Sequence, residues 1–367
     1  MLKFCKGIFS SALFVVLLIP FSLTSCAKNK NSNLDYSSPY ADFINERTFS
    51  MLCVVPNIEP GKIGYIAGTG WLFKKSINAD YEYYLATNLH VSASYPYYST
   101  AGKSVSFWLS YCPDYKNSNY YIPYVEQMKD LPDYFYQINS YSILASTPEQ
   151  RPILANYSSA LGYECDLDFN VFDVNFGTSN DISSNDPFRK NGSPLLNRLN
   201  GLNQYAQTKA NNLLEFADSN YTYKKNMSIH VGGFPARPWA INERRLKWIC
   251  YQTYIDNWYF AASQNNPLIN PEDPIQFAPQ DYHIAILGKE LAYGVNTTSE
   301  LTGGSSGSMI IDDDNKVIGI NFASAHSEDE YSSLQGFGLF LNCNNNFFGN
   351  NYRYEIFNSW LAFKNLP

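Results

Sequence analysis

Charged residues are scarce in this sequence of 367 residues. They account for 16% of the chain, hydrophobic residues account for 45%, and the formal net charge is −7 at pH 7. A chain with this balance can bury a sizeable core, which excludes wholesale disorder. A nucleic-acid-binding protein normally presents a basic face, whereas this chain is acidic overall. We therefore expect no nucleic acid among its partners.

Cysteine is also sparse and lacks the spacing of a metal site or a disulfide framework. The sequence has 7 cysteines and no CxxC pair, which excludes a zinc knuckle and a dense disulfide scaffold. The histidines show no metal spacing either, so we expect no metal and no organic cofactor. Most of the later cysteines are expected to be small buried apolar side chains, and their pairing is left open. These are Cys53, Cys112, Cys165, Cys250 and Cys343.

A long uncharged apolar run occurs at the N-terminus, from Ile8 to Phe21, and no second run of about 18 residues follows it. Lys3 and Lys6 precede the run, which is the arrangement of a secretory signal. The run is also shorter than the roughly 20 residues that a membrane-spanning helix needs. We therefore predict that residues 1–25 are a signal peptide.

The signal ends in Leu23-Thr24-Ser25-Cys26, which resembles the bacterial lipobox. The resemblance implies a lipid group, diacylglyceryl and commonly a further acyl chain such as palmitate, on Cys26. Two or more acyl chains give stable anchoring. We predict a lipoprotein on the extracellular face of the cell membrane, with residues 26–46 as a flexible tether. An ordinary secretory signal with an incidental cysteine is the alternative.

The rest of the chain has the composition of a mainly β protein. Aromatic residues make up 16% of it, and short apolar runs alternate with Asn- and Ser-rich segments. We predict a first β half over 47–178, a loop and helix insertion over 179–225, and a second β half with a C-terminal segment over 226–367. In the insertion, Ser193 and Pro194 suit an N-cap and a first helical position. A closing helix is predicted from Tyr354 to Phe363.

Three segments carry the residue types of nucleophilic catalysis. A predicted strand ends at His90, another opens at Asp168, and a Gly-rich turn, GGSSGS, contains Ser306. A Ser hydroxyl attacks well only when a base removes its proton, and His suits that task near neutral pH. A carboxylate on the other ring nitrogen fixes the tautomer of the imidazole. Glycines allow the backbone N–H groups to point at one spot and form an oxyanion hole.

The order His, Asp, Ser and the local sequences resemble the chymotrypsin-like serine peptidases. More narrowly, the lipobox, the TNLHV, DFNV and GGSSGS segments resemble the mycoplasma lipoprotein family that includes the mycoplasma immunoglobulin protease. The resemblance covers residues from about 47 to 345. It implies a chymotrypsin-like double β-barrel with a helical insertion between the barrels.

The resemblance also implies roles for single residues. Ser306 would be the nucleophile, His90 the general base and Asp168 the orienting acid, while the N–H groups of Gly304 and Ser306 would form the oxyanion hole. The usual GDSGG turn has an acid where this chain has Ser305, so no activation step that frees an N-terminus to pair with that acid is expected. Whether the hole is preformed stays open.

Alternatives remain for several of these residues. Asp166 lies two residues from Asp168 on the same strand face, and Asp173 is a third candidate acid. Ser305 also fits the GxSxG elbow of α/β-hydrolases, but the residues after it favour strand, turn, strand rather than a helix. Glu300 would favour a basic substrate side chain. We interpret His230, His283 and His326 as structural or solvent-facing.

These features predict a membrane-anchored surface lipoprotein that acts as a serine endopeptidase on proteins or peptides. The family resemblance implies host proteins such as immunoglobulin as substrates. The competing hypothesis is a catalytically degenerate surface lipoprotein that serves as a binding or adhesion module. The sequence leaves the cleavage specificity and the oligomeric state open.

Overall fold

The computed structural model describes eighteen stretches of the chain. They are residues 33–34, 39–92, 105–112, 116, 122–123, 135–144, 169–177, 193–218, 220–224, 226–237, 245–246, 248–261, 268–270, 273–277, 291–297, 304–326, 333–347 and 350–355.

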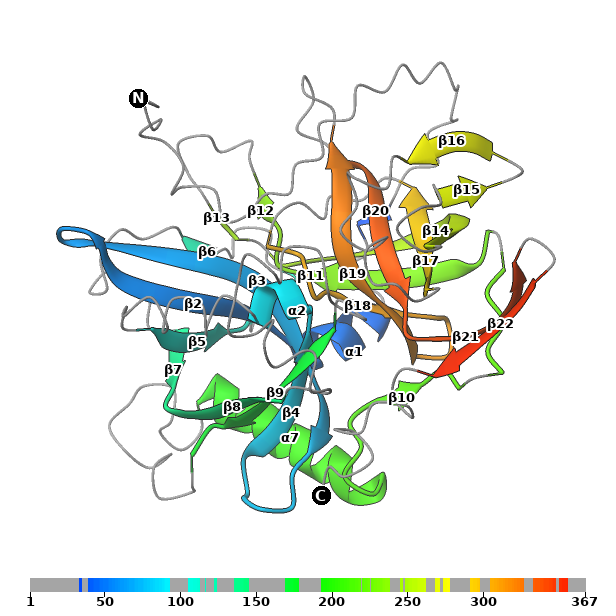
Figure 1. The fold of residues 1–367 in the computed structure, drawn as a ribbon. Helices are drawn as coiled ribbons and strands as arrows, with labels where there is room; N and C mark the ends of the chain where they lie inside the picture. The colour runs from blue at the N-terminus through cyan, green and yellow to red at the C-terminus, as the bar shows by residue number, and fades with distance from the viewer. Residues whose placement is uncertain are drawn as a thin grey trace, which may run out of the picture.

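Two sheets dominate the molecule and stand side by side (Figure 1), and all their strand pairs are antiparallel except β10 with β19. The first has the strand order β7-β5-β2-β3-β4-β9-β8. Its strands are β2 (Thr48–Glu59), β3 (Lys62–Lys75), β4 (Glu82–Thr87), β5 (Ser106–Ser110), β7 (Phe135–Ile138), β8 (Ser140–Leu144) and β9 (Asn170–Asn175).

The second sheet closes on itself like a barrel. Along the order β14-β11-β18-β19-β20-β17, the last strand pairs back with the first, while β1 adds to β14 and β10 adds to β19. The strands are β1 (Asn33–Leu34), β10 (Glu215–Phe216), β11 (Ser228–Gly233), β14 (Ile249–Ala261), β17 (Leu291–Thr297), β18 (Met309–Ile311), β19 (Lys316–His326) and β20 (Ser333–Phe340).

Shorter elements complete the described fold. The helices are α1 (Pro39–Arg47), α2 (Leu89–Ser92) and α7 (Pro194–Thr208). The small sheets contain β6 (Ile122–Pro123), β12 (Ala236–Arg237), β13 (Arg245–Leu246), β15 (Leu268–Asn270), β16 (Asp273–Phe277), β21 (Asn342–Phe347) and β22 (Asn350–Glu355). In the described segments, no helix is both long and apolar enough to span a bilayer. The prediction of a mainly β fold is confirmed, with two principal sheets of which one is barrel-like.

Helix α7 forms where the sequence predicts it. The Ser193 hydroxyl accepts a hydrogen bond from the Leu196 N–H at 3.2 Å, and Pro194 opens the helix. This N-cap satisfies one of the amide groups that a helix start leaves unpaired. The apolar stripe of α7 packs into the same core as the first sheet, so the packing does not set the helix apart as an insertion between the halves. The stripe comprises Leu195, Leu199, Leu202 and Ala206.

Helix α1 corrects the predicted tether, which was expected to extend to residue 46. Ala41 and Ile44 are fully buried, and the Arg47 Nε donates to the Leu213 carbonyl at 2.9 Å. The Tyr40 hydroxyl, at the other end of the helix, donates to the Asp313 carbonyl at 3.1 Å. Contacts with both halves therefore hold residues 39–46 in a helix, which local sequence alone does not specify.

The structure also bears on two other expectations. Strand β22 covers Asn350–Glu355, so the first residues of the predicted closing helix are extended instead. Cys53, Cys112 and Cys250 are buried and outside any disulfide, as expected of small apolar side chains. The signal, Cys26, Cys165 and the rest of the predicted closing helix lie outside the described residues.

Leu199 tests whether α7 is part of the core. Replacing this side chain, which is 1% exposed, by Ala should lower the free energy of unfolding by about 2–5 kcal/mol, because the change leaves a cavity. Gln204→Ala, on the exposed side of the same helix, should change it by about 0.5 kcal/mol or less. Equilibrium urea unfolding of the full chain measures both. Equal effects from the two variants would contradict the packing of α7.

Candidate active site

The turn that leads into β18 has a backbone that only glycine adopts readily. We call residues Gly304–Ser308 the nucleophile turn. Its two glycines have φ of +90° at Gly304 and +93° at Gly307. A Cβ on Gly307 would also overlap the carbonyl oxygen of Thr69 on β3. The glycines are therefore needed for the shape of the turn, as the sequence predicts.

Hydrogen bonds hold the carbonyl groups of this turn in place. The Ser305 carbonyl accepts from the Ser308 N–H at 2.9 Å and from the Ser308 hydroxyl at 2.6 Å. The Ser306 carbonyl accepts from the Thr69 N–H at 2.7 Å. The Gly307 carbonyl accepts from the Trp71 indole N–H at 2.9 Å. The turn is thus fixed to itself and to β3 of the other half.

This arrangement leaves the N–H and hydroxyl of Ser306 available. In a trans peptide the N–H points opposite to the C=O, so the inward Ser305 carbonyl directs the Ser306 N–H out of the turn. Over the part of the chain that the structure describes, neither this N–H nor the Ser306 hydroxyl has a hydrogen-bond partner. Ser306 is half-buried. Such an outward N–H beside a reachable hydroxyl is suited to be one donor of an oxyanion hole.

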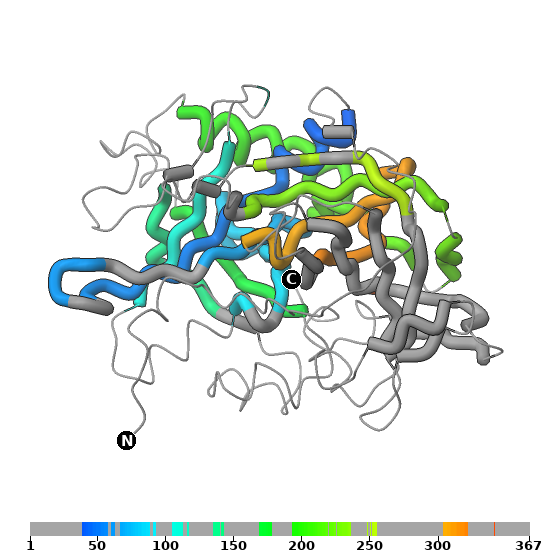
Figure 2. The backbone as a smooth tube through the Cα atoms, turned by 90° about the horizontal axis from the view of Figure 1, so that it is seen from above, coloured from blue at the N-terminus to red at the C-terminus, as the bar shows by residue number. Residues whose placement is uncertain are grey.

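The segment that carries His90 lies next to the nucleophile turn. Strand β4 ends at Thr87, and its hydroxyl donates to the Thr69 carbonyl at 2.7 Å. Thr69 in turn binds Ser306, so one residue connects the end of β4 with the turn. Figure 2 shows the orange turn region beside the blue and cyan strands of the first half.

Helix α2 begins two residues after Thr87 and contains His90. A Cβ on Gly68 would overlap the Val91 side chain, so α2 packs closely on β3 at this glycine. The structure therefore places the backbone of His90 on the same short region of β3 that binds the nucleophile turn. The His90 side chain lies outside what the structure describes.

Asp168 and Asp166 lie outside the described residues, but the strand pairing limits where the chain enters β9. Asn170 pairs with Thr87 in the antiparallel β4–β9 ladder. The chain before Asn170 and the chain after Thr87 therefore leave the ladder at the same end. The side-chain amide of Asn170 donates to the Ser92 hydroxyl at 2.8 Å and fixes this end of β9 to α2.

Asp173 sits elsewhere on the ladder. It pairs with Tyr84, three residues from the Asn170 pair, which is about 10 Å along a strand. Burial, with Glu82 as a second cause, raises the pKa of the Asp173 carboxyl to about 6. This position separates Asp173 from the end of the ladder that approaches α2.

Ser305 is not on a hydrolase elbow. The nucleophile turn leads into β18, a turn and β19, and residues 304–326 contain no helix. Ser305 is 2% exposed, and the Asn321 Nδ2 lies 3.4 Å from its hydroxyl oxygen. The strand-turn-strand expectation is confirmed, and Ser306 is the more accessible of the two serines.

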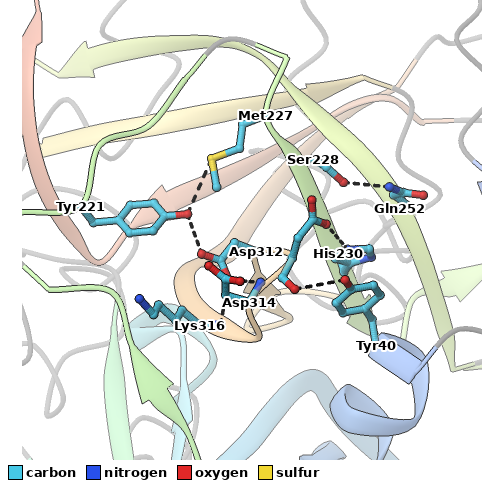
Figure 3. A network of polar contacts seen from close by, with 10 residues as sticks. Tyr40, Tyr221, Met227, Ser228, His230, Gln252, Asp312, Asp314 and Lys316 are labelled. Carbon is cyan, nitrogen blue, oxygen red and sulfur yellow. Dashed lines mark hydrogen bonds and ion pairs between the residues drawn. The ribbon is translucent and has the colours of Figure 1, made fainter.

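His230 has a structural place in the second half, as predicted. Figure 3 shows its ring against Tyr40, and the two rings stack with centroids 3.6 Å apart. The His230 Nε2 lies 2.8 Å from the Asp313 Oδ1. Nearby, Asp312 accepts hydrogen bonds from the N–H groups of Asp314 and Lys316 and from the Tyr221 hydroxyl (Figure 3). These carboxylates organise the β18–β19 turn.

Gly303, Glu300 and His283 lie outside the described residues, as does the side chain of His326. Among the residues that the structure describes, no three His, Cys, Asp or Glu side chains form a group that could hold a metal ion.

A sequence model of one family matches this chain over residues 39–323, and the family is described as mycoplasma immunoglobulin protease. The protein belongs to this family. The match spans the first sheet, α7, the nucleophile turn and most of β19, so the assignment covers all three sequence segments of the candidate site. Family membership makes the protein a peptidase.

Three of the solved structures to which the chain is similar all have low sequence identity to it. An inactive form of Rv3671c from M. tuberculosis is 12% identical and has a TM-score of 0.38, over 84% of this chain and 89% of that one. The thermostable serine protease AL20 from an extremophilic microorganism is 12% identical, with a TM-score of 0.38 over 82% and 92%. A Glu endopeptidase is 10% identical, with a TM-score of 0.36 over 84% and 89%. No curated protein matched the chain.

Sequence reasoning missed the residues that hold the site together. Thr69, Thr87 and Asn170 are each fully buried and each hydrogen-bonds a segment far away in the sequence. The GTG and TN segments that contain the two threonines are visible in the sequence, but it does not show that Thr69 binds the nucleophile turn or that Thr87 binds β3. A threonine between two glycines in an apolar strand is the local signal that could have pointed to Thr69.

The shifted pKa of Asp173 predicts a pH-dependent stability. With a folded-state pKa of about 6 against an ordinary 3.8, the folded protein holds a proton that the unfolded chain releases. Stability therefore falls as the pH rises from about 4 to 6. Asp173→Asn should abolish this fall, so the variant should melt above the wild type at pH 7 and close to it below pH 4.

Thermal unfolding between pH 3.5 and pH 8, at roughly half-unit steps across the expected window, measures this difference. Asp80→Asn, at an exposed position in the turn before β4, is the control, and its melting temperature should follow that of the wild type at every pH. A variant D173N that melts at or below the wild type at pH 7 would contradict the assignment.

Proposed function

We propose that the protein is a serine endopeptidase with Ser306 as nucleophile, His90 as general base and Asp168 as the residue that orients the base. The observation that carries the proposal is the connection through Thr69. Its N–H binds the Ser306 carbonyl, and its own carbonyl binds the hydroxyl of Thr87, three residues before His90. Two segments far apart in the sequence thus meet where a nucleophile and its base are needed.

The proposed reaction is acyl transfer in two steps. The Ser306 hydroxyl attacks a peptide carbonyl while His90 takes its proton, and His90 then protonates the leaving amine. The N–H groups of Ser306 and Gly304 stabilise the oxyanion, and water afterwards releases the acyl group. The outward Ser306 N–H supports the first donor, because the Ser305 carbonyl is held inward.

The substrates that we propose are proteins, with immunoglobulin as the first candidate. The description of the matching family supports this choice. Attachment through a lipid on Cys26 would hold the enzyme at the outer face of the membrane, where host proteins are accessible. The lipobox and the apolar stretch before it support this location.

A fluorophosphonate probe on the full chain in detergent tests the catalytic residues. The wild type should be labelled, and Ser306→Ala and His90→Ala should abolish labelling because nucleophile and base are lost. Asp168→Asn should slow labelling by about 10³–10⁴, whereas Asp166→Asn should not. Ser142→Ala, at an exposed serine on β8, is the matched control and should be labelled like the wild type.

The same variants separate the enzyme from a binding module. Incubation with purified immunoglobulin should give fragments with the wild type and none with S306A. A wild type that the probe never labels would instead favour the degenerate adhesion protein. Labelling and ester turnover without cleavage of any protein would indicate an ester hydrolase. Labelling that persists in S306A would overturn the nucleophile.

The lipid anchor has its own test in cells fed an alkyne analogue of palmitate. The wild type should incorporate the label and partition into the detergent phase of Triton X-114, because two acyl chains bind a bilayer stably. Cys26→Ser should lose both properties. Cys5→Ser, within the part of the signal that is removed, is the control and should keep them. A labelled C26S protein would contradict the anchor.

A further inference from the structure

We propose that Thr69 is the positioning residue of the nucleophile turn. Its hydrogen bonds hold the turn in the conformation that directs the Ser306 N–H toward a substrate carbonyl. This inference rests on the proposed function and extends it, because it assigns the preorganisation of the oxyanion hole to a residue on the opposite half of the molecule.

Thr69 uses every polar group that it has. Its N–H donates to the Ser306 carbonyl at 2.7 Å, and its hydroxyl donates to the Gly304 carbonyl at 3.0 Å. The same hydroxyl accepts from the Phe234 N–H, at the end of β11, at 3.1 Å. Thr69 itself is 0% exposed, so no water competes for these groups. These two bonds restrain the Gly304–Ser305 and Ser306–Gly307 peptides, which flank the peptide that carries the Ser306 N–H.

The Thr69 carbonyl completes the connection on the side of the base. It accepts from the Thr87 hydroxyl at 2.7 Å, just before α2 begins. The neighbouring Gly68 gives α2 room to pack against β3 through Val91. Any movement of Thr69 would therefore shift the nucleophile turn relative to the helix that carries His90.

The hydroxyl of Thr69 is needed because the turn contains glycine. Gly304 has φ of +90°, a region in which glycine moves with little steric restraint. Without the bond to its carbonyl, the peptide between Gly304 and Ser305 can rotate, and the following Ser306 N–H would turn with it. A valine at position 69 would keep the shape of the side chain and leave both the Gly304 carbonyl and the Phe234 N–H unpaired.

The same hydrogen bonds explain how the nucleophile turn keeps its shape without the acidic residue of the usual GDSGG turn. Ser305 stands where the usual turn has an acid that pairs with a freed N-terminus. Here the Thr69 hydroxyl and N–H hold one side of the turn, and Ser308 holds the Ser305 carbonyl from the other side. The Ser306 N–H, the first donor of the proposed hole, is therefore held in place without an N-terminus freed by cleavage.

The test compares Thr69→Val, Thr69→Ser and Thr48→Val in the full chain. Thr48 is the matched control, because it is also 0% exposed and its hydroxyl donates to the Ile44 carbonyl at 2.7 Å, away from the turn. The rate of fluorophosphonate labelling is measured against probe concentration, which separates kinact from KI. Melting temperatures are recorded for all variants.

T69V should lower kinact by about 10²-fold with little change in KI, because the oxyanion donor is misplaced while the probe still binds. T69S should restore most of the rate, since it keeps the hydroxyl. T48V should lower the melting temperature and leave kinact unchanged. A folded T69V protein labelled at the wild-type rate would overturn the inference, as would an equal loss of kinact in T48V.

Labelling of the wild type and of S306A distinguishes a failure of the proposed function from a failure of the role of Thr69. A wild type without labelling, or labelling that survives in S306A, would overturn the proposed function and this inference with it. Labelling that depends on Ser306 but not on the Thr69 hydroxyl would overturn the role of Thr69 alone.

Discussion

The structure depends on one short hydrogen bond between its halves, from the Thr69 N–H to the Ser306 carbonyl at 2.7 Å. Strand β3 belongs to the first sheet and the nucleophile turn leads into the second, so this bond sets how the two sheets meet. The neighbouring bonds to Gly304 and Gly307 repeat the same connection at two further points. A chain that has lost these contacts would lose the position of the nucleophile turn against β3.

Burial gives these polar contacts their importance. Thr87, Ser308 and Thr69 are all 0% exposed, and their hydroxyl groups donate to backbone carbonyls. A buried polar group without a partner costs free energy, so each contact excludes other arrangements of the turn. The glycines add steric restrictions, because side chains on Gly307 or Gly233 would overlap Thr69 or Ser308. The junction between the halves is therefore specific as well as stable.

Local patterns in the sequence were sufficient for part of this picture. Ser193 and Pro194 predicted the start of α7, and the residues after Ser306 predicted a β hairpin, because both depend on neighbours in the chain. The site itself required segments that the topology brings together. The roles of Thr69 and Asn170 depend on partners on other elements, and no spacing in the sequence reveals such partners. Helix α1 was missed for the same reason, since contacts at both of its ends stabilise it.

The pairing of β1 with β14 has a consequence for access to the enzyme. Asn33 pairs with Gln252 in the second sheet, and only residues 27–32 separate it from Cys26. An extended chain advances at most about 3.6 Å per residue, so these steps span roughly 25 Å. With the proposed lipid on Cys26, this short segment would keep the barrel-like half close to the bilayer surface. Large protein substrates would then have to approach laterally or from the side away from the membrane. The membrane would sterically exclude substrates that can approach only from its own side.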